Sequence, residues 1–295
     1  MNKQRVIIIG SDSFIGLNLS SFLKENFEVI CISRNLNNSS SHIQVASYET
    51  CLCDLNLKND IIINCVYNQD NFDYNIQLVD HIYNIYNDRN IRKFIFISTA
   101  VVVGNVCDDF ITEDTLCKPN SDYELQKFAI EEYIKTKHNN DFEVIIIRPT
   151  AIFGPGGKNL NKFIDLELFG NPILNYLRAF IYGKRKLHLI PIELFNSQIF
   201  FLINRQVSNL LSYNIISLDT DIDNNFNAII TIIRRYLKRN HVFQICLPIF
   251  FTKLIFKICN RESFDISRIY ISNLDNPINF TIRNSIENYL KLYIK

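Results

Sequence analysis

The sequence contains no tryptophan, one methionine, eight glycines and seven prolines among its 295 residues. Charges of opposite sign nearly cancel, with 31 Lys and Arg against 30 Asp and Glu. We therefore expect no nucleic-acid partner, because no global field would attract one. Hydrophobic residues make up 47% and charged residues 21%, the balance of an ordinary globular protein. The length suffices for one or two folded domains.

The eight cysteines form no CxxC pair, and no His/Cys cluster has the spacing of zinc ligands. Cys31 and Cys65 stand inside apolar runs, where cysteine behaves as a small hydrophobe. Reduced thiols of this kind are typical of the cytoplasm rather than of a secreted disulfide scaffold. The sequence predicts a cytoplasmic protein without a metal site.

No segment reads as a transmembrane helix. The first apolar run, Val6–Ile9, is too short for the core of a signal peptide. The most membrane-like stretch, Val242–Cys259, contains Pro248, Lys253 and Lys257, which disfavour a spanning helix. We expect a buried helix here, and peripheral contact with a membrane is the alternative.

Short aliphatic runs alternate with helix-like segments through the first half of the chain. The expected strands are Val6–Ile9, Glu28–Ser33, Ile61–Val66, Lys93–Ser98 and Glu143–Arg148. The expected helices are Phe14–Glu25, Asn75–Asn87 and Tyr123–Lys137, with a loop at Asn35–Ser41. Aliphatic strands separated by helices are typical of a parallel sheet covered on both faces. The predicted fold class is therefore α/β, with a Rossmann-like, doubly wound sheet.

This alternation weakens after Gly154-Pro155-Gly156-Gly157, where aromatic and mostly helical segments begin. We place a domain boundary near residue 155. It separates a Rossmann domain over 1–155 from a smaller C-terminal lobe over 156–295.

A glycine-containing segment joins the first strand to the first helix. Gly10 permits a tight turn, and Gly16 permits close packing of the helix on the strand. Ser13 replaces the middle glycine of a GxxGxxG pattern, and its hydroxyl can bond a phosphate oxygen. The N–H groups at the helix start, at Phe14 and Ile15, suit a pyrophosphate. The two glycines could serve only a turn, but their place on the first strand favours dinucleotide binding.

Arg34 follows the second strand, where NAD-binding proteins usually carry an acidic residue for the ribose hydroxyls. A guanidinium without that acid suits the 2′-phosphate of NADP. The cofactor is therefore expected to be NAD or NADP, with NADP favoured. The alternative for Arg34 is a solvated loop residue.

Tyr123 and Lys127 lie four residues apart, on one face of a predicted helix. A tyrosine hydroxyl has a pKa of about 10, and a cation about 4 Å away supplies the roughly 4 kcal/mol that brings it near 7. The pair is therefore a candidate acid/base unit. The same spacing recurs in two other pairs, Tyr133 with Lys137 and Tyr182 with Lys186. Only the surroundings of Tyr123 distinguish it.

Those surroundings comprise the motifs GSDSFIG, INCV, FISTAVVVG, YELQK and RPTAIFGPGG, in this order. Together they resemble the extended short-chain dehydrogenases/reductases, and among these the NAD-dependent epimerase/dehydratase family, which acts on nucleotide sugars. The resemblance covers about residues 4–157. It implies that the lobe over 156–295 binds a nucleotide sugar.

The resemblance also implies a role for each matching residue. Tyr123 would exchange a proton with the sugar hydroxyl, Thr99 would hydrogen-bond the reacting oxygen, and Lys127 would bind the nicotinamide ribose. Ser98 is the alternative to Thr99, and Asn75 matches an Asn of the family. The cofactor contacts would be Gly10, Ser13, Phe14, Ile15, Gly16, Arg34, Asn64, Val66, Ser98, Tyr123, Lys127 and Pro149.

A homodimer is a further implication. In this family two helices beside the sheet often form a four-helix interface, here Asn75–Asn87 and Tyr123–Lys137. The apolar contributors would be Tyr83, Tyr86, Ile130 and Ile134.

The reaction is narrowed by Ala100 and Val101, which stand where the family's 4,6-dehydratases carry an Asp-Glu pair. Eliminating water needs an additional acid and base, so dehydration is disfavoured. A nucleotide-sugar epimerase or 4-ketosugar reductase, in surface-polysaccharide precursor synthesis, is expected instead. A 3,5-epimerising reductase would need a further Cys/His pair, for which Cys107 and His188 are candidates. For Cys107, a loop thiol without chemistry is the favoured interpretation.

A non-catalytic dinucleotide-binding or scaffold protein is the alternative function, supported by Ser13 and by Val103 and Phe153, which replace family tyrosines. The cation that would bind a diphosphate is one of Arg178, Lys184, Arg185, Arg205 and Arg268.

Overall fold

The computed structural model describes residues 3–34, 42–45, 48, 60–88, 91–138, 142–206, 210–239, 245–258, 266–275 and 279–293. The expected loop Asn35–Ser41 and the side chain of Tyr86 lie outside the described part of the chain. The chain forms two compact units, each assembled from separate segments. The first unit comprises Met1–Gly104, Pro119–Arg148 and Asn196–Asn214, and the second comprises Asn105–Lys118, Pro149–Phe195 and Ile215–Lys295.

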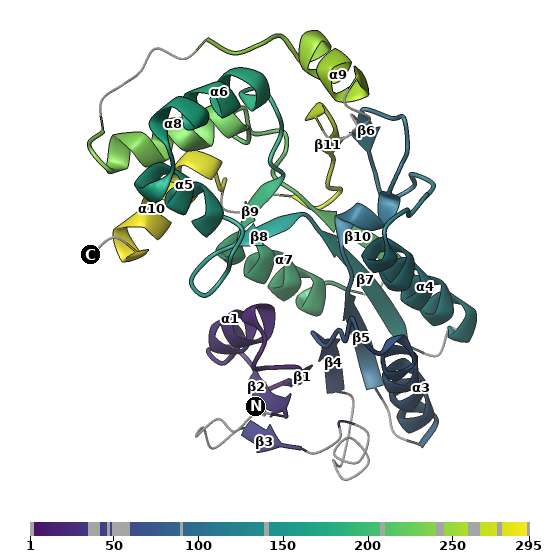
Figure 1. Ribbon diagram of the computed structural model, residues 1–295. Coiled ribbons are helices and arrows are strands. Elements are labelled where there is room, and N and C mark those ends of the chain that lie inside the picture. Colours follow the sequence, from purple (N-terminus) through teal and green to yellow (C-terminus); the bar gives the residue numbers. More distant parts are fainter. Residues whose placement is uncertain are drawn as a thin grey trace. The chain divides into compact units, whose positions relative to one another are not determined.

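A seven-stranded sheet has the order β10-β7-β5-β4-β1-β2-β3 (Figure 1). Its strands are β1 (Arg5–Ile9), β2 (Glu28–Ser33), β3 (His42–Gln44), β4 (Asp60–Asn64), β5 (Ile91–Ile97), β7 (Glu143–Pro149) and β10 (Leu211–Ile216). The pairings from β3 through β7 are all parallel. The strand order reverses direction between β1 and β4, as in a doubly wound sheet, so the predicted fold class is confirmed.

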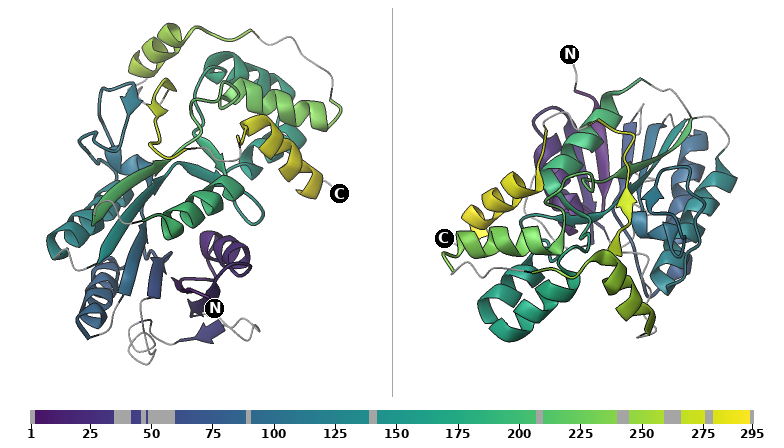
Figure 2. Two further views of the ribbon diagram at one scale, coloured as in Figure 1. Left: turned by 180° about the vertical axis from the view of Figure 1, so that it is seen from behind. Right: turned by 90° about the horizontal axis from the view of Figure 1, so that it is seen from above.

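Helices cover both faces of this sheet. The helices α3 (Phe72–Asp88) and α4 (Asp122–Lys137) lie along one face, and α1 (Phe14–Leu23) and α7 (Ile192–Asn204) along the other (Figures 1 and 2). The central strands are buried on both sides, which explains their continuous aliphatic sequences.

A hydrophobic core fills the space between the sheet and the helices α3 and α4, and it contains residues that the sequence predicts at a dimer interface. Tyr83, Ile130 and Ile134 are buried in this core together with Ile62 and Phe94. They pack against their own chain, so they cannot be apolar contributors to an interface with a second copy. Helical periodicity places a residue on an apolar face but does not show which surface covers it.

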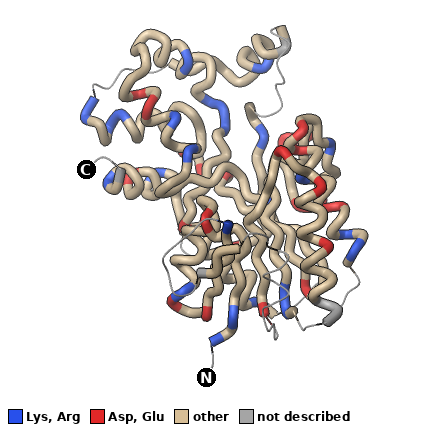
Figure 3. The backbone as a smooth tube through the Cα atoms, turned by 60° about the horizontal axis from the view of Figure 1, so that its bottom comes forward, with Lys and Arg blue, Asp and Glu red and all other residues tan. Residues whose placement is uncertain are grey.

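The second unit is largely helical. Its helices are α5 (Asn161–Phe169), α6 (Pro172–Tyr182), α8 (Phe226–Tyr236), α9 (Ile249–Ile258) and α10 (Ile282–Tyr293). Two short parallel pairs complete it, β8 (Ala151–Phe153) with β9 (Leu189–Pro191), and β6 (Phe110–Ile111) with β11 (Ile269–Tyr270). Phe153 packs edge-on against Tyr289. Figure 3 shows that charges of both signs are scattered along the chain.

The helix α9 is not the buried helix that the sequence predicts. One face is anchored, because the Thr252 hydroxyl donates to the Ile181 carbonyl and Phe256 packs on Tyr182. Phe250 and Ile258 on its other side are exposed. Within the described residues, no helix is long and apolar enough to cross a membrane.

Candidate active site

The start of α4 fixes the two candidate catalytic residues. Ser121 caps the helix by accepting a hydrogen bond from the Glu124 N–H, and the Glu124 side chain accepts one from the Ser121 N–H. This reciprocal capping box satisfies two donors that the first turn leaves free. Tyr123 therefore stands in the first turn, and Lys127 follows one turn later on the same face.

The Thr99 side chain lies close enough to the Tyr123 hydroxyl to lower the pKa of Tyr123. Thr99 follows the carboxyl end of β5 and caps the short helix η1 (Ala100–Val103). The preceding Ser98 donates its N–H to the Ile147 carbonyl at 2.8 Å, which ties this edge to β7. Its buried Oγ has no hydrogen-bond partner among the described residues. Both candidates for binding the reacting oxygen thus lie at the carboxyl edge of the sheet, where such folds bind ligands.

Lys127 is buried, and its Nζ donates to the Ile97 carbonyl at 3.0 Å. Burial lowers the pKa of Lys127 to about 8, although Glu131 and then Cys65 act in the opposite direction. An ammonium taken out of water is disfavoured relative to the neutral amine. The structure therefore holds Lys127 close to its titration point at neutral to mildly alkaline pH.

Burial raises the pKa of Tyr123, and the Thr99 side chain only partly opposes this. The expectation that Lys127 alone would bring this pKa near 7 is therefore wrong for the chain by itself. The physical reason is that Lys127 Nζ is directed to the Ile97 carbonyl and that burial disfavours the phenolate. The Tyr123 hydroxyl is consequently protonated at neutral pH.

Tyr67 is a site residue that the sequence analysis missed. Its ring meets the Tyr123 ring edge-to-face, with centroids 5.3 Å apart. Lys127 Nζ lies 4.4 Å from the Tyr67 ring centroid, and the Tyr67 hydroxyl donates to Gln126 Oε1 at 2.8 Å. The only available signal was its place just after β4, at the same sheet edge as Thr99.

The glycine segment between β1 and α1 is built for close backbone approach. Gly10 has φ +78°, and a Cβ there would lie 2.8 Å from Val66 Cγ2. A Cβ on Gly16 would lie 2.3 Å from the Gly10 carbonyl oxygen, so no side chain fits without a backbone shift. Both glycines are therefore required by the backbone, whatever else they do.

Ser13 is engaged in this loop. Its hydroxyl donates to the Gly10 carbonyl at 2.8 Å and accepts from the Gly16 N–H at 3.1 Å, capping α1. The first-turn N–H groups of Phe14 and Ile15 cannot bond within the helix. They point out of a helix N-terminus, which fits the pyrophosphate of a nicotinamide dinucleotide.

The predicted cofactor residues Asn64, Arg34 and Pro149 each stand at the end of a strand. Asn64 ends β4, and its Oδ1 accepts from the Val66 N–H at 2.9 Å, which shapes the loop beside Gly10. Arg34 is exposed just after β2, and Pro149 is the last residue of β7. All of them lie at strand carboxyl ends. Asn75, which matches an Asn of the family, orders the loop before α3. Its Oδ1 accepts from the Asn68 N–H, and its Nδ2 donates to the Asn68 and Asn71 carbonyls.

The other two Tyr/Lys pairs serve structure. Tyr133 and Lys137 both contact Asp80, at 2.6 and 2.9 Å. Lys186 Nζ donates to the backbone carbonyls of Asp219 and Asp221, at 2.6 and 3.1 Å. Neither pair has the sheet-edge surroundings of Tyr123, as the sequence analysis predicts.

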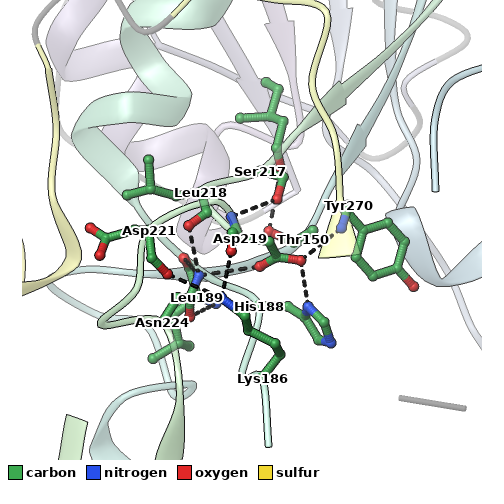
Figure 4. A network of polar contacts seen from close by, with 11 residues as sticks. Thr150, Lys186, His188, Leu189, Ser217, Leu218, Asp219, Asp221, Asn224 and Tyr270 are labelled. Carbon is green, nitrogen blue, oxygen red and sulfur yellow. Dashed lines mark hydrogen bonds and ion pairs between the residues drawn. The ribbon is translucent and has the colours of Figure 1, made fainter. Parts of the chain in front are cut away.

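His188 belongs to a polar cluster in the second unit (Figure 4). Its Nδ1 lies 2.6 Å from Asp219 Oδ2, and Asp219 also accepts from the Tyr270 N–H and from Asn224 Nδ2. The fully buried Asp219 carboxylate therefore links His188 to the loop that carries Asn224 and to Tyr270 of β11. Cys107 is an exposed thiol.

Three of the candidate diphosphate-binding cations are engaged within the chain. Arg205 belongs to the first unit and lies 3.5 Å from Glu143, while Arg268 is buried and donates to the Val106 carbonyl. Arg178 donates to Asn175 Oδ1. No group of three or more His, Cys, Asp or Glu residues that could hold a metal occurs in the described part of the chain.

Comparison with known proteins adds a family match. The model of the NAD-dependent epimerase/dehydratase family matches residues 6–169. A UDP-glucose 4-epimerase of Vibrio cholerae is 37% identical over 91 residues, a match that covers 29% of this chain and 27% of the epimerase.

Solved structures agree in fold over the whole length. A UDP-glucose 4-epimerase has a TM-score of 0.70 at 14% identity, covering 99% of each chain. MoeE5 in complex with UDP-glucose and NAD has a TM-score of 0.69 at 16% identity, covering 98% of each chain. The dTDP-glucose 4,6-dehydratase of Bacillus anthracis, in complex with NAD, has a TM-score of 0.65 at 16% identity, covering 99% of this chain and 96% of the dehydratase.

Proposed function

This chain belongs to the NAD-dependent epimerase/dehydratase family, and we propose from that premise that it is a nucleotide-sugar 4-epimerase or 4-ketosugar reductase. The observation that carries the proposal is the placement of Thr99, just after β5, beside Tyr123, with Lys127 one turn further along α4. We also propose a role in surface-polysaccharide precursor synthesis, which the family resemblance implies.

The residues of the chain account for the proton in such a reaction. In a reductase, neutral Tyr123 would donate its proton to the keto oxygen, whereas in an epimerase the Tyr123 phenolate would first accept the proton of the 4-hydroxyl and then return it to the keto oxygen. Thr99 orients Tyr123, and the Lys127 ammonium favours the phenolate. NAD(P), when bound, supplies the acceptor and donor of hydride. Ala100 and Val101 offer neither acid nor base, so dehydration is not proposed.

The proposed cofactor site consists of the Phe14 and Ile15 N–H groups at the helix start, Asn64, Val66 and Ser98 at the strand ends, and Pro149. NADP is proposed in preference to NAD because β2 ends in Ser33, which Arg34 follows, with no acidic residue at the strand end. NAD is the cofactor in the similar structures of MoeE5 and the dehydratase. Replacing Arg34 by Ala is expected to weaken NADP binding about tenfold and to leave NAD binding unchanged, as measured by calorimetry. Equal effects on both would contradict the role of Arg34.

Turnover tests the proposed function directly. Purified protein with NADPH or NADH would be assayed on UDP-, dTDP- and GDP-sugars and their 4-keto derivatives. Tyr123→Phe should abolish turnover and retain cofactor binding, whereas Tyr133→Phe, in the half-buried pair on the same helix, should retain both. Cofactor binding without turnover of any sugar would favour the non-catalytic alternative.

We also propose that two copies pair through the solvent-facing sides of α3 and α4. Sedimentation equilibrium measures this, and a monomer at micromolar concentration would contradict it.

A further inference from the structure

Tyr67 contacts three residues on adjoining turns of α4. The edge-to-face contact restrains the plane of the Tyr123 ring, because aromatic pairs prefer this arrangement at 4.5–7 Å. The hydroxyl bond to Gln126, which stands between Tyr123 and Lys127 in sequence, fixes the orientation of Tyr67 itself. The face of the Tyr67 ring lies against the Lys127 ammonium, with Nζ 4.4 Å from the ring centroid. One side chain thus restrains both members of the catalytic pair.

The surroundings of Lys127 show why this contact matters. Glu131 is its neighbour on α4, but Glu131 is bound to Arg148 on β7 at 2.6 Å. The Cys65 thiol is neutral, because burial raises its pKa to about 12. In the described part of the chain, no carboxylate forms an ion pair with Lys127. Glu131 favours the Lys127 charge from a distance, and the groups in direct contact with the ammonium are the Ile97 carbonyl and the rings of Tyr67 and Phe96, the latter at 5.2 Å.

We propose that Tyr67 is a positioning residue for proton transfer, because its ring holds the Lys127 ammonium and the Tyr123 ring in a working arrangement. The proposal rests on the proposed function, although the hold on Lys127 is a property of the chain by itself. A carboxylate in this place would bind the ammonium more strongly, but its charge would also oppose the Tyr123 phenolate. A neutral aromatic face stabilises the cation without that repulsion.

The experiment uses three substitutions at position 67 in the full chain. Tyr67→Leu removes the ring, and Tyr67→Phe keeps it while removing the bond to Gln126. Pentafluorophenylalanine at this position keeps the shape but removes the negative ring face, so it separates electrostatics from packing. The Lys127 titration midpoint would be measured by NMR on lysine labelled with ¹³C at Cε, with Lys127→Arg to assign the signal. Dependence of kcat and KM on pH would be measured alongside.

Tyr67→Leu and the fluorinated variant should lower the Lys127 midpoint by about one pH unit. Both should lower kcat with little change in KM, and the alkaline limb of kcat should move in the same direction. Tyr67→Phe should keep the wild-type midpoint and most of the activity. Tyr133→Leu is the matched control, because the half-buried Tyr133 ring lies 5.4 Å from Nζ of another lysine of the same helix, Lys137. It should leave the Lys127 midpoint unchanged.

An unchanged Lys127 midpoint in the fluorinated variant would overturn the proposal, even if kcat fell, because packing alone would then explain the loss. If Tyr67→Leu does not fold, the fluorinated variant decides. Absence of turnover in the wild type would refute the proposed function, and the NMR midpoint would still decide whether Tyr67 holds Lys127.

Discussion

Arg148 on β7 and Glu131 on α4 form a buried ion pair, with Nη2 2.6 Å from Oε2 and Nε 3.2 Å from each carboxylate oxygen. The pair joins the central sheet to the helix that carries Tyr123 and Lys127. Removing one member of a buried pair leaves the other charge without compensation, which costs about 3–5 kcal/mol.

Glu131→Ala should therefore lower the free energy of unfolding by about 3–5 kcal/mol in urea denaturation. Glu132 is the matched control, because it forms an exposed pair with Lys135 at 3.6 Å. Glu132→Ala should change stability by less than about 0.5 kcal/mol. Similar losses in both variants would contradict the structural role of the buried pair.

Stability should depend on pH through Lys127. Its pKa is lowered to about 8 in the folded chain and is about 10.4 when unfolded. Between these values the unfolded chain binds more protons, so stability rises with pH across this window, while below pH 8 the contribution is constant. Relative to Lys127→Met, the wild type should gain about 3 kcal/mol between pH 7.5 and 10.5. Parallel unfolding curves for the two proteins would disprove this.

Gly16→Ala should damage the loop before α1. The new Cβ would lie 2.3 Å from the Gly10 carbonyl oxygen and 2.7 Å from Ser11 Cα, both backbone atoms. We expect a loss of about 1–3 kcal/mol and of dinucleotide binding, measured by thermal unfolding and calorimetry. Ser13→Gly is the control, since glycine at a helix cap costs only a few tenths of a kcal/mol. If Gly16→Ala bound the cofactor normally, close approach at this position would be unnecessary.

Asp219 should be important for stability of the second unit. Asp219→Ala would remove the buried carboxylate that contacts His188 Nδ1 and accepts from the Tyr270 N–H, while Asn224 Nδ2 would keep its bonds to the Leu189 and Leu218 carbonyls. We expect a loss of about 3 kcal/mol or more in chemical denaturation. Asp223 is paired with the partly exposed Arg283, so Asp223→Ala should cost about 1 kcal/mol or less. Equal stability of the Asp219 and Asp223 variants would contradict this.

Much of the first unit was predictable because its signals are local. The aliphatic strands β1, β2, β4, β5 and β7 and the helices α1, α3 and α4 occur within a few residues of their predicted ranges. The strands β3 and β10 were not predicted. They extend the sheet at its two edges, where fewer neighbours require an aliphatic run. The burial of α9 was predicted wrongly because composition does not show which faces are covered.

For the candidate site, the sequence by itself determined that Tyr123 and Lys127 share a helix face, that Thr99 follows a buried strand, and that Gly10 and Gly16 begin and end a turn into a helix. Spacing along one element suffices for each of these. Only the tertiary structure decided the surroundings of the pair. It brought Tyr67 from the end of β4 over Lys127, and it buried Lys127 without an ion pair to any carboxylate in the described part of the chain. Contacts between distant segments set the charge state of a buried group, because its pKa depends on desolvation and on whichever groups the fold places around it.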